Sequence, residues 1–288
     1  MSIFMNLRSR ITNVFLITIC LVNVVCSQNA SISKVADPAQ DKSDAKITYI
    51  ANEGVLIETP EKKVLIDGLH RFYKTAYAFP PDKLRGKLES AEAPYDDIDL
   101  ILVSHLHGDH FHPESVGLHL QNSRKAQLAT SEQIVGEVKE KFKDQTNIAS
   151  KIISVKHKWK TAAERDFDGI KVKFLGLRHG SKRFMWIQNL GHLIEIEGRK
   201  FLHLGDADMT AENFSTFKLN QEDIDIAFIP FWFLLSKEGR DLVKKQFEPK
   251  HIIAVHVSPQ DAESVSKELK KHDPGITVFT KILETKTF

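Results

Sequence analysis

Three histidines and one aspartate lie close together in the run SHLHGDH, residues 104–110. His105 and His107 are two residues apart, so both imidazoles point to one side of an extended chain that leaves a strand. The glycine after them permits a sharp turn, and Asp109 and His110 can then direct a carboxylate and a third imidazole at a neighbouring point. Such ligands suit Zn²⁺, and Fe²⁺ or Mn²⁺ also accepts them. The run predicts a metal site; the alternative is a histidine-rich surface loop without an ordered ion.

Three residues outside this loop are further candidate ligands, because each follows a strand-like apolar run. They are His179 in LRHGSKR, Asp206 in LHLGDAD and His256 at the end of HIIAVH. Each of them alone is more typical of a capping residue or a polar core residue. Together with the 104–110 loop they form a candidate ligand set at the ends of separate strands.

The order of these motifs resembles that of the metallo-β-lactamase-fold hydrolase superfamily, over residues 47–279. In that superfamily the HxHxDH loop is followed by a lone histidine, a Gly-Asp motif and a final histidine, on a four-layer αββα sandwich (α+β) of two pseudo-symmetric halves. The resemblance implies two ligand groups, with Asp206 bridging them: His105, His107 and His179 for one metal ion, and Asp109, His110 and His256 for the other. It also implies that Asp67, in VLIDG, supports the ligand loop without binding metal itself.

The resemblance implies a binuclear hydrolase with two divalent ions, most simply Zn²⁺, with Fe²⁺ or Mn²⁺ as alternatives. Two such ions lower the pKa of a shared water, and Asp109 would orient the resulting hydroxide or take its proton. The expected substrate is an ester, lactone, amide or phosphodiester. The layout looks most like the branch with ascorbate-phosphate lactonases and N-acyl-phosphatidylethanolamine phospholipases. The alternatives are a metal-binding or scaffolding protein with little turnover, and a diiron redox protein.

The positioning elements include an internal repeat. GVLIE at 54–58 recurs as GHLIE at 191–195, and DIDLILV at 97–103 recurs as DIDIAFI at 223–229. Two matches in the same order favour a duplicated half-structure over a coincidence between hairpins.

Strand-like and helix-like patterns follow one another from residue 47 to the end of the chain. The predicted strands are 47–50, 55–58, 64–66, 100–104, 126–129, 151–155, 170–175, 193–196, 201–204, 226–229, 251–256 and 277–279. The predicted helices are 114–121, 131–142, 237–247 and 260–272, the last with Ser258 as N-cap and Pro259 near its start. Two batches of strands, each followed by helices, predict a sheet sandwich flanked by helices.

Residues 1–27 are typical of a secretory signal peptide, with a basic segment ending at Arg10 and an apolar run over 11–25. This run is shorter than the about 20 residues that a membrane span needs, so we expect an exported protein, periplasmic or secreted, with no stable membrane span. Cys20 and Cys26 both lie in this segment, so the mature chain has no thiolate ligand. A lipid anchor on Cys26 is the weaker alternative. Residues 28–44 are predicted to be a flexible leader, and residues 45–288 the hydrolase domain.

The charge balance excludes a nucleic-acid binder. Lys and Arg number 40 against 38 Asp and Glu, and the excess arginines lie in the first 27 residues, so the remainder is neutral. A nucleic-acid binder needs a strong positive field. We therefore expect a small-molecule or lipid-like substrate; the sequence carries no signal for oligomeric state.

Three residues are candidate substrate contacts. Arg71, in a loop after Asp67, and Arg183 could each receive a phosphate or carboxylate, with a solvated loop cation as the alternative. Trp232, in the run FWF, could form the wall of an apolar pocket, with core packing as the alternative for these rings.

Overall fold

A computed structural model describes residues 42–288 of the chain, so the predicted signal peptide and most of the predicted leader lie outside the described residues. Lys42, within that predicted leader, places its Nζ 2.7 Å from Asp225 Oδ1. Contacts with the domain therefore begin a few residues before the predicted boundary at 45. Among the described residues, no helix is both long and apolar enough to cross a bilayer.

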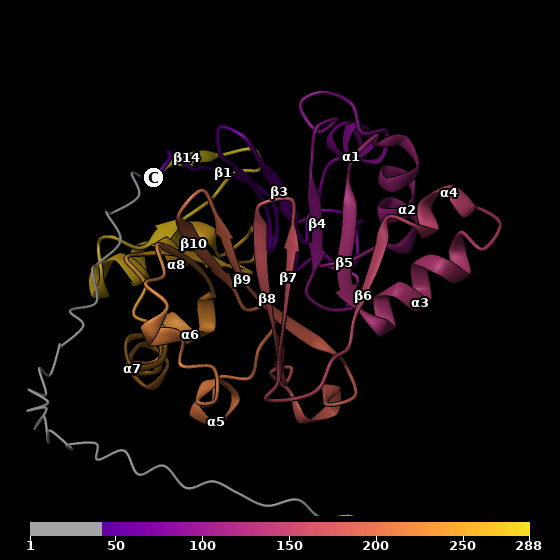
Figure 1. The fold of residues 1–288 in the computed structure, drawn as a ribbon. Coiled ribbons are helices and arrows are strands. Elements are labelled where there is room, and N and C mark those ends of the chain that lie inside the picture. The colour runs from indigo at the N-terminus through magenta and orange to yellow at the C-terminus, as the bar shows by residue number, and fades with distance from the viewer. Residues whose placement is uncertain (1–41) are drawn as a thin grey trace, which may run out of the picture. The chain divides into compact units, whose positions relative to one another are not determined.

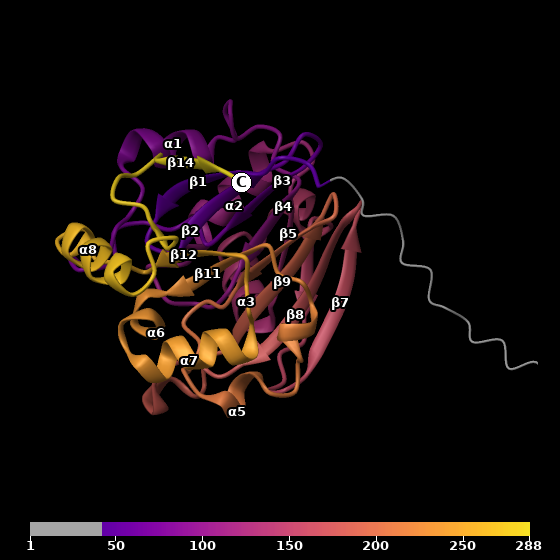
Figure 2. The same cartoon turned by 90° about the vertical axis from the view of Figure 1, so that its left-hand side faces the viewer.

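Two seven-stranded mixed sheets form the centre of the fold (Figure 1). The first sheet has the order β14 (Thr285–Thr287), β1 (Lys46–Ala51), β2 (Gly54–Glu58), β3 (Lys63–Ile66), β4 (Leu100–Val103), β5 (Gln127–Ser131), β6 (Ile152–Val155). The second has the order β13 (Thr277–Val278), β12 (His251–Val255), β11 (Ile226–Pro230), β10 (Arg199–His203), β9 (Asn189–Ile196), β8 (Ile170–Leu177), β7 (Ala162–Phe167). At the C-terminus β14 pairs with β1, as Figure 2 shows.

The internal repeat corresponds to equivalent strands of the two sheets. β2 and β3 pair antiparallel and β3 and β4 pair parallel; β9, β10 and β11 repeat this pattern. In both sheets the remaining strands on that side, β5 and β6 or β12 and β13, add in parallel. The predicted duplication of strands is thus present in the topology.

Alternation of side chains along each strand creates three apolar cores. In β2, Val55 and Ile57 face the core between the sheets, whereas Leu56 faces the helices. In β10, Phe201 and Leu202 divide in the same way between the central core and the helix-side core of the second sheet. Three cores between four layers confirm the predicted αββα sandwich.

Helices cover the outer face of each sheet (Figure 1). On the first sheet lie α1 (Asp82–Glu89), α2 (Pro113–Asn122), α3 (Glu132–Lys141) and α4 (Thr146–Ala149). On the second lie α5 (Ala211–Phe214), α6 (Phe231–Leu235), α7 (Lys237–Gln246), α8 (Ala262–His272) and the 3₁₀ turn η2 (Leu219–Gln221). A further 3₁₀ turn, η1 (Lys182–Phe184), lies between β8 and β9 in the chain. The predictions for α2, α3 and α7 agree within two residues.

The predicted helix 260–272 also agrees within two residues, but its predicted N-cap, Ser258, is wrong. Ser258 and Pro259 precede the helix, which begins at Ala262 with Asp261 at the N-cap position. The sequence also gave no sign of α1, because only Leu84 and Leu88 of this helix are buried. A pattern of two apolar residues is too short to reveal a helical period. The edge strand β7 was missed for a related reason, since most of its residues are exposed.

Candidate metal centre

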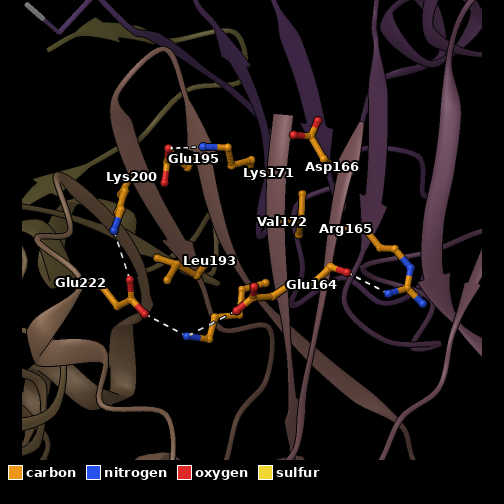
Figure 3. A pocket seen from close by; sticks show the side chains of 10 residues that line it. Glu164, Arg165, Asp166, Lys171, Val172, Leu193, Glu195, Lys200 and Glu222 are labelled. Atoms are coloured by element: carbon orange, nitrogen blue, oxygen red, sulfur yellow. Dashed lines mark hydrogen bonds and ion pairs between the residues drawn. The ribbon is translucent and has the colours of Figure 1, made fainter. Parts of the chain in front are cut away.

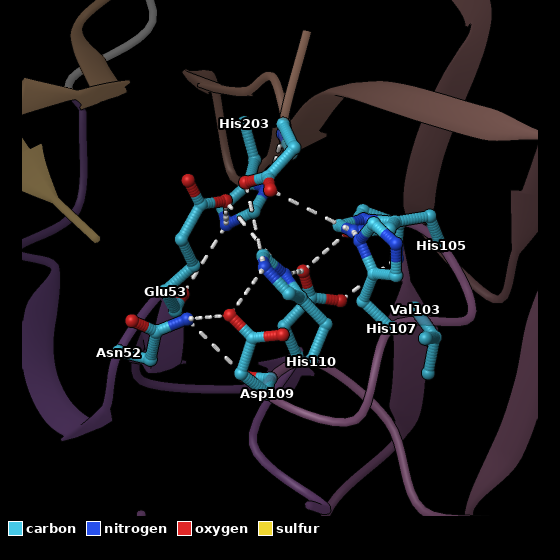
Figure 4. A network of polar contacts seen from close by, with 12 residues as sticks. Asn52, Glu53, Val103, His105, His107, Asp109, His110 and His203 are labelled. Atoms are coloured by element: carbon cyan, nitrogen blue, oxygen red, sulfur yellow. Dashed lines mark hydrogen bonds and ion pairs between the residues drawn. The ribbon is translucent and has the colours of Figure 1, made fainter. Parts of the chain in front are cut away.

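All seven predicted ligands lie just beyond strand ends, at one end of the sandwich. His105, His107, Asp109 and His110 follow β4, His179 follows β8, Asp206 follows β10, and His256 follows β12. Figure 4 shows side chains of the β4 loop pointing toward one another beside Asn52 and Glu53. The structure therefore brings together residues that are up to about 150 positions apart in the chain. Two groups of facing ligand atoms result.

The first group comprises His105, His107, His179 and Asp206. His107 presents Nδ1, which lies 2.9 Å from His105 Nε2 and 3.1 Å from His179 Nε2. Asp206 Oδ2 lies 3.8 Å from His105 Nε2 and 3.4 Å from His179 Nε2. Three imidazole nitrogens and one carboxylate oxygen thus surround one point.

The second group comprises Asp109, His110 and His256. Asp109 Oδ2 lies 3.6 Å from His110 Nε2 and 3.3 Å from His256 Nε2. The other oxygen of Asp206, Oδ1, lies 3.4 Å from each of these two nitrogens. Asp206 consequently offers one oxygen to each group, the arrangement expected of a bridging carboxylate.

The spacing and the unpaired atoms both fit divalent metal ions. With metal–nitrogen bonds of about 2.0–2.1 Å, neighbouring ligand atoms lie about 2.9–3.4 Å apart. The separations of the first group are close to this range. In addition, His110 Nε2, His256 Nε2 and Asp206 Oδ1 are buried and have no hydrogen-bond partner among the described residues. A buried polar atom without a partner costs about 1–3 kcal/mol, which a bound cation would offset.

The family described as "Beta-lactamase superfamily domain" matches residues 46–256. The chain belongs to the metallo-β-lactamase superfamily.

Relatives and solved structures agree with this assignment. The chain is 26% identical over 220 residues to a UPF0173 metal-dependent hydrolase of Pelotomaculum thermopropionicum, covering 73% of this chain and 83% of that protein. Its fold is similar to Igni18, described as a novel metallo hydrolase from Ignicoccus hospitalis, with TM-score 0.58, 16% identity and coverage of 85% and 99%. It is also similar to CmlA, a diiron β-hydroxylase from Streptomyces venezuelae, with TM-score 0.55, 14% identity and coverage of 86% and 54%. The comparisons confirm the predicted fold and, at this coarse level, the prediction of a metal-dependent hydrolase.

Asp67 supports the ligand loop in the way that the resemblance implied. The residue is fully buried, and its Oδ2 accepts hydrogen bonds from His110 Nδ1 at 2.8 Å and Ser104 Oγ at 2.5 Å. Its Oδ1 accepts a hydrogen bond from the Ser104 backbone N–H at 2.7 Å. The hydrogen bond from Nδ1 to Asp67 turns Nε2, the other ring nitrogen of His110, toward the carboxylates of the site.

Two supporting residues were not identified from the sequence. Asn52 Nδ2 donates to Asp109 Oδ2 at 3.1 Å, which restrains that carboxylate. Glu53 is fully buried, and its Oε2 lies 3.6 Å from His203 Nε2 and 4.0 Å from His110 Nδ1. The two residues form the turn between β1 and β2, where an Asn-Glu-Gly sequence gives no hint of a distant metal loop. Their closeness to the ligands depends on the packing of the first hairpin against both sheets.

Burial and neighbouring charges shift the pKa values of the candidate ligands in different directions. Burial is the main cause that lowers the pKa of His107, to about 4, so this imidazole is neutral near pH 7. Burial also acts to lower the pKa of His256, but Asp206 and Asp109 outweigh it and raise that pKa to about 10. Asp109 is itself held near 2, because the histidines outweigh the effect of burial on its pKa. A metal ion must therefore displace a proton from His256, and binding should release it.

The three candidate substrate contacts have different surroundings. Arg71 forms ion pairs with Glu89 at 2.8 Å and Glu114 at 2.9 Å. These ion pairs link α1 to α2, and Arg71 stays a predicted substrate contact.

Arg183 and Trp232 lie close to the ligands. The exposed guanidinium of Arg183 lies 4.4 Å from the centre of the Phe184 ring, which in turn lies 4.6 Å from His107. The half-buried ring of Trp232 lies 5.1 Å from the ring of His256. Both residues remain predicted substrate contacts.

A separate depression of about 330 Å³ lies on strands β7 to β10, away from these ligands (Figure 3). Its charged side chains form ion pairs: Lys171 with Glu195 across β8 and β9 at 3.0 Å, and Lys173 and Lys200 with Glu222, which follows η2, at 2.9 and 3.1 Å. None of the seven candidate ligands lines it. We attribute its charges to the solvated outer face of the sheet.

Proposed function

We propose that the protein is a binuclear metal hydrolase that cleaves an ester, lactone, amide or phosphodiester. The observation that carries the proposal is Asp206, whose two oxygens each face a different group of histidines. A single mononuclear site would leave the second group of buried atoms without a partner. The candidate ions are Zn²⁺, with Fe²⁺ or Mn²⁺ as alternatives.

Residues His105, His107 and His179 would hold one ion, residues Asp109, His110 and His256 the other, and Asp206 would bridge the two. When bound, such ions lower the pKa of a water to near neutrality and stabilise negative charge on the substrate oxygen. The protein fixes the ligands before any ion arrives, through Asp67 behind His110 and Asn52 behind Asp109.

Asp109 has the second role of orienting the nucleophile or taking its proton. Its Oδ1 makes no hydrogen bond to another described residue, whereas Oδ2 accepts from Asn52 at 3.1 Å and faces His256 at 3.3 Å. We expect the variant Asp109→Ala to lose at least a hundredfold in kcat even where one ion per chain remains. An Asp109→Ala enzyme with bound metal and full activity would contradict this role.

The central experiment is elemental analysis of full-length protein purified without chelator, together with assays on a phosphodiester, a lactone and a β-lactam. We expect about two zinc ions per chain and cleavage of one substrate class. Less than half an ion per chain, with no activity after zinc addition, would overturn the hydrolase and favour a binding or scaffolding protein. Two iron ions in a coloured protein with little hydrolysis would favour redox chemistry.

We also propose export, on the strength of the sequence of residues 1–27. The mass of the protein isolated from its own cells tests it. A mature chain that begins at Gln28 supports cleavage after a signal peptide, and a chain that begins at a lipid-modified Cys26 supports an anchor. Retention of Met1 and the following apolar run would contradict export.

A further inference from the structure

A largely apolar cavity lies next to the candidate ligand His256; none of the seven candidate ligands lines it, but Tyr77, which contacts His256, does. Its volume is about 600 Å³, within the range of about 300–1,000 Å³ that small-molecule sites occupy. Its apolar and aromatic lining comes from four parts of the chain: residues 77–81, residues 257–262, residues 279–282, and Tyr49 of β1. One lining residue, Val257, directly follows the candidate ligand His256 in the chain.

Tyr77 connects the cavity to the ligands. Its ring lies edge-on to the His256 ring, with centres 5.2 Å apart, and the same side chain lines the cavity. Tyr73 stacks on Tyr77 at 6.0 Å and also lies against the ligand loop, since a Cβ at Gly108 would come within 2.7 Å of Tyr73 Cδ2. Tyr77 therefore contacts both a candidate ligand and the cavity.

Aromatic rings also line the other sides of the ligands. Phe184 of η1 lies 4.6 Å from the His107 ring and 5.0 Å from the His179 ring. Trp232 of α6 lies 5.1 Å from the His256 ring. The ligands are therefore bordered by apolar surface from three separate segments: the 70–81 loop, η1 with the residues after it, and α6.

The same three segments expose most of the large hydrophobic side chains found on the described surface. Phe72, Tyr73, Met185, Trp186 and Leu235 are 57%, 41%, 55%, 62% and 37% exposed; Leu283 is the sixth such residue of the described chain. Exposed apolar side chains that gather in one region usually mark a binding site. Here they gather on the segments that border the candidate metal centre.

We propose that the cavity binds an acyl or aryl group of the substrate, so that the reacting carbonyl or phosphoryl lies at the metal centre. The inference rests on the proposed hydrolase function and names the substrate class: a molecule with an extended apolar group next to the scissile bond. A small polar sugar lactone would leave the apolar lining without a partner and does not fit.

The first test uses the zinc-loaded full chain and a series of p-nitrophenyl esters from acetate to octanoate. Because burying a methylene contributes about 0.8 kcal/mol, kcat/KM should rise about twofold to fourfold per methylene until the cavity is full. A flat or falling series would overturn the inference.

Two variants that fill the cavity locate the effect. Thr75→Trp and Ala262→Leu each add volume at a lining position, the first at an exposed residue and the second at a buried one. Each should lower the ratio of octanoate to acetate kcat/KM at least tenfold. The matched control Thr216→Trp, at an exposed position outside the lining, should leave the ratio unchanged. Equal losses on both esters in the cavity variants would contradict the proposal.

A binding measurement without metal separates this inference from the proposed function. Chelator-treated protein should bind dansyl-labelled undecanoic acid saturably, Thr75→Trp should weaken this binding at least tenfold, and Thr216→Trp should not. Acetate hydrolysis with neither probe binding nor a chain-length effect would refute the cavity assignment and leave the hydrolase standing. Probe binding at the cavity without hydrolysis of any ester would refute the hydrolase and leave an apolar ligand site.

Discussion

The variant Asp67→Asn tests how the support behind the ligands controls metal binding. Both oxygens of Asp67 act as acceptors: Oδ1 for the Ser104 N–H at 2.7 Å, and Oδ2 for His110 Nδ1 at 2.8 Å. An asparagine supplies one acceptor and one NH₂ group. Placed at the Oδ1 position, the NH₂ opposes the Ser104 N–H. Placed at the Oδ2 position, it donates to His110 Nδ1 and moves the ring proton to Nε2, the atom that faces Asp206.

We expect Asp67→Asn to lower two measurable quantities, the affinity for zinc and the unfolding free energy. Loss of such a support typically lowers metal affinity about 10–100-fold, here because His110 loses the carboxylate that orients its ring and makes Nε2 a stronger ligand. Loss of one buried hydrogen bond to a charged acceptor should also lower the unfolding free energy of the metal-free protein by about 1.5–3 kcal/mol. Burial alone would raise the pKa of Asp67, but His110, His203 and Ser104 outweigh it and lower that pKa. The wild-type residue is therefore an anion at neutral pH.

The assay is competition for zinc between the protein and a chromogenic chelator, combined with urea unfolding of the metal-free protein. Asp225→Asn is a matched control, because Asp225 is also a buried carboxylate but pairs with Lys42 and Lys250. We expect both variants to lose stability and only Asp67→Asn to lose zinc affinity. Unchanged zinc affinity in a folded Asp67→Asn protein, or an equal loss in the control, would refute the reasoning.

Three further predictions concern the bridge, a buried histidine and the ions themselves. Asp206→Asn removes one anionic ligand atom from each group, so we expect elemental analysis to find at least one ion per chain fewer and hydrolysis to fall at least a hundredfold. Burial lowers the pKa of His119 to about 4, so the unfolded chain binds the extra proton between pH 6.5 and 4, and stability from this group is lost as pH falls through that window. Urea unfolding should show that, between pH 6.5 and 4, the unfolding free energy of His119→Gln falls by roughly 3 kcal/mol less than that of the wild-type protein. Removal of metal by chelator should lower the thermal midpoint, and zinc at about a thousandfold above its Kd should restore about 4 kcal/mol.

The repeated strands could be predicted because their residues are buried on both faces. GVLIE and GHLIE lie in strands between two apolar layers, so their apolar character survives in a single sequence. By contrast, α1 depends on only two buried leucines, and the start of α8 is set by the turn from His256 to Asp261. His256 itself has a positive φ of 62°, which ends β12 one residue before the predicted limit.

The clustering of the candidate ligands could be predicted because metal chemistry restricts residue type and spacing, and four of the seven lie in one short loop. The supporting residues Asn52 and Glu53 follow no such rule. Asn52 contacts Asp109 across 57 positions, and Glu53 contacts His203 across 150. Contacts of this kind arise from how hairpins pack, which a local pattern does not encode. The cavity beside Tyr77 was hidden for the same reason, since its lining combines Tyr49 and the 75–81 loop with residues 257–262 and 279–282.

The two halves of the fold contribute different parts of one site. After β4 the chain forms the ligand loop, and at the equivalent point after β11 it forms α6, which places Trp232 beside His256. Neither half completes a ligand group. The loop after β4 supplies two residues to each group, and the second half supplies the remaining histidine of each group, after β8 or β12, together with Asp206 after β10. An ion would therefore bind only when both sheets are packed together. Since the ligand loop and α6 come from different halves, substitutions in α6 can change the apolar wall while the ligand loop after β4 keeps its sequence.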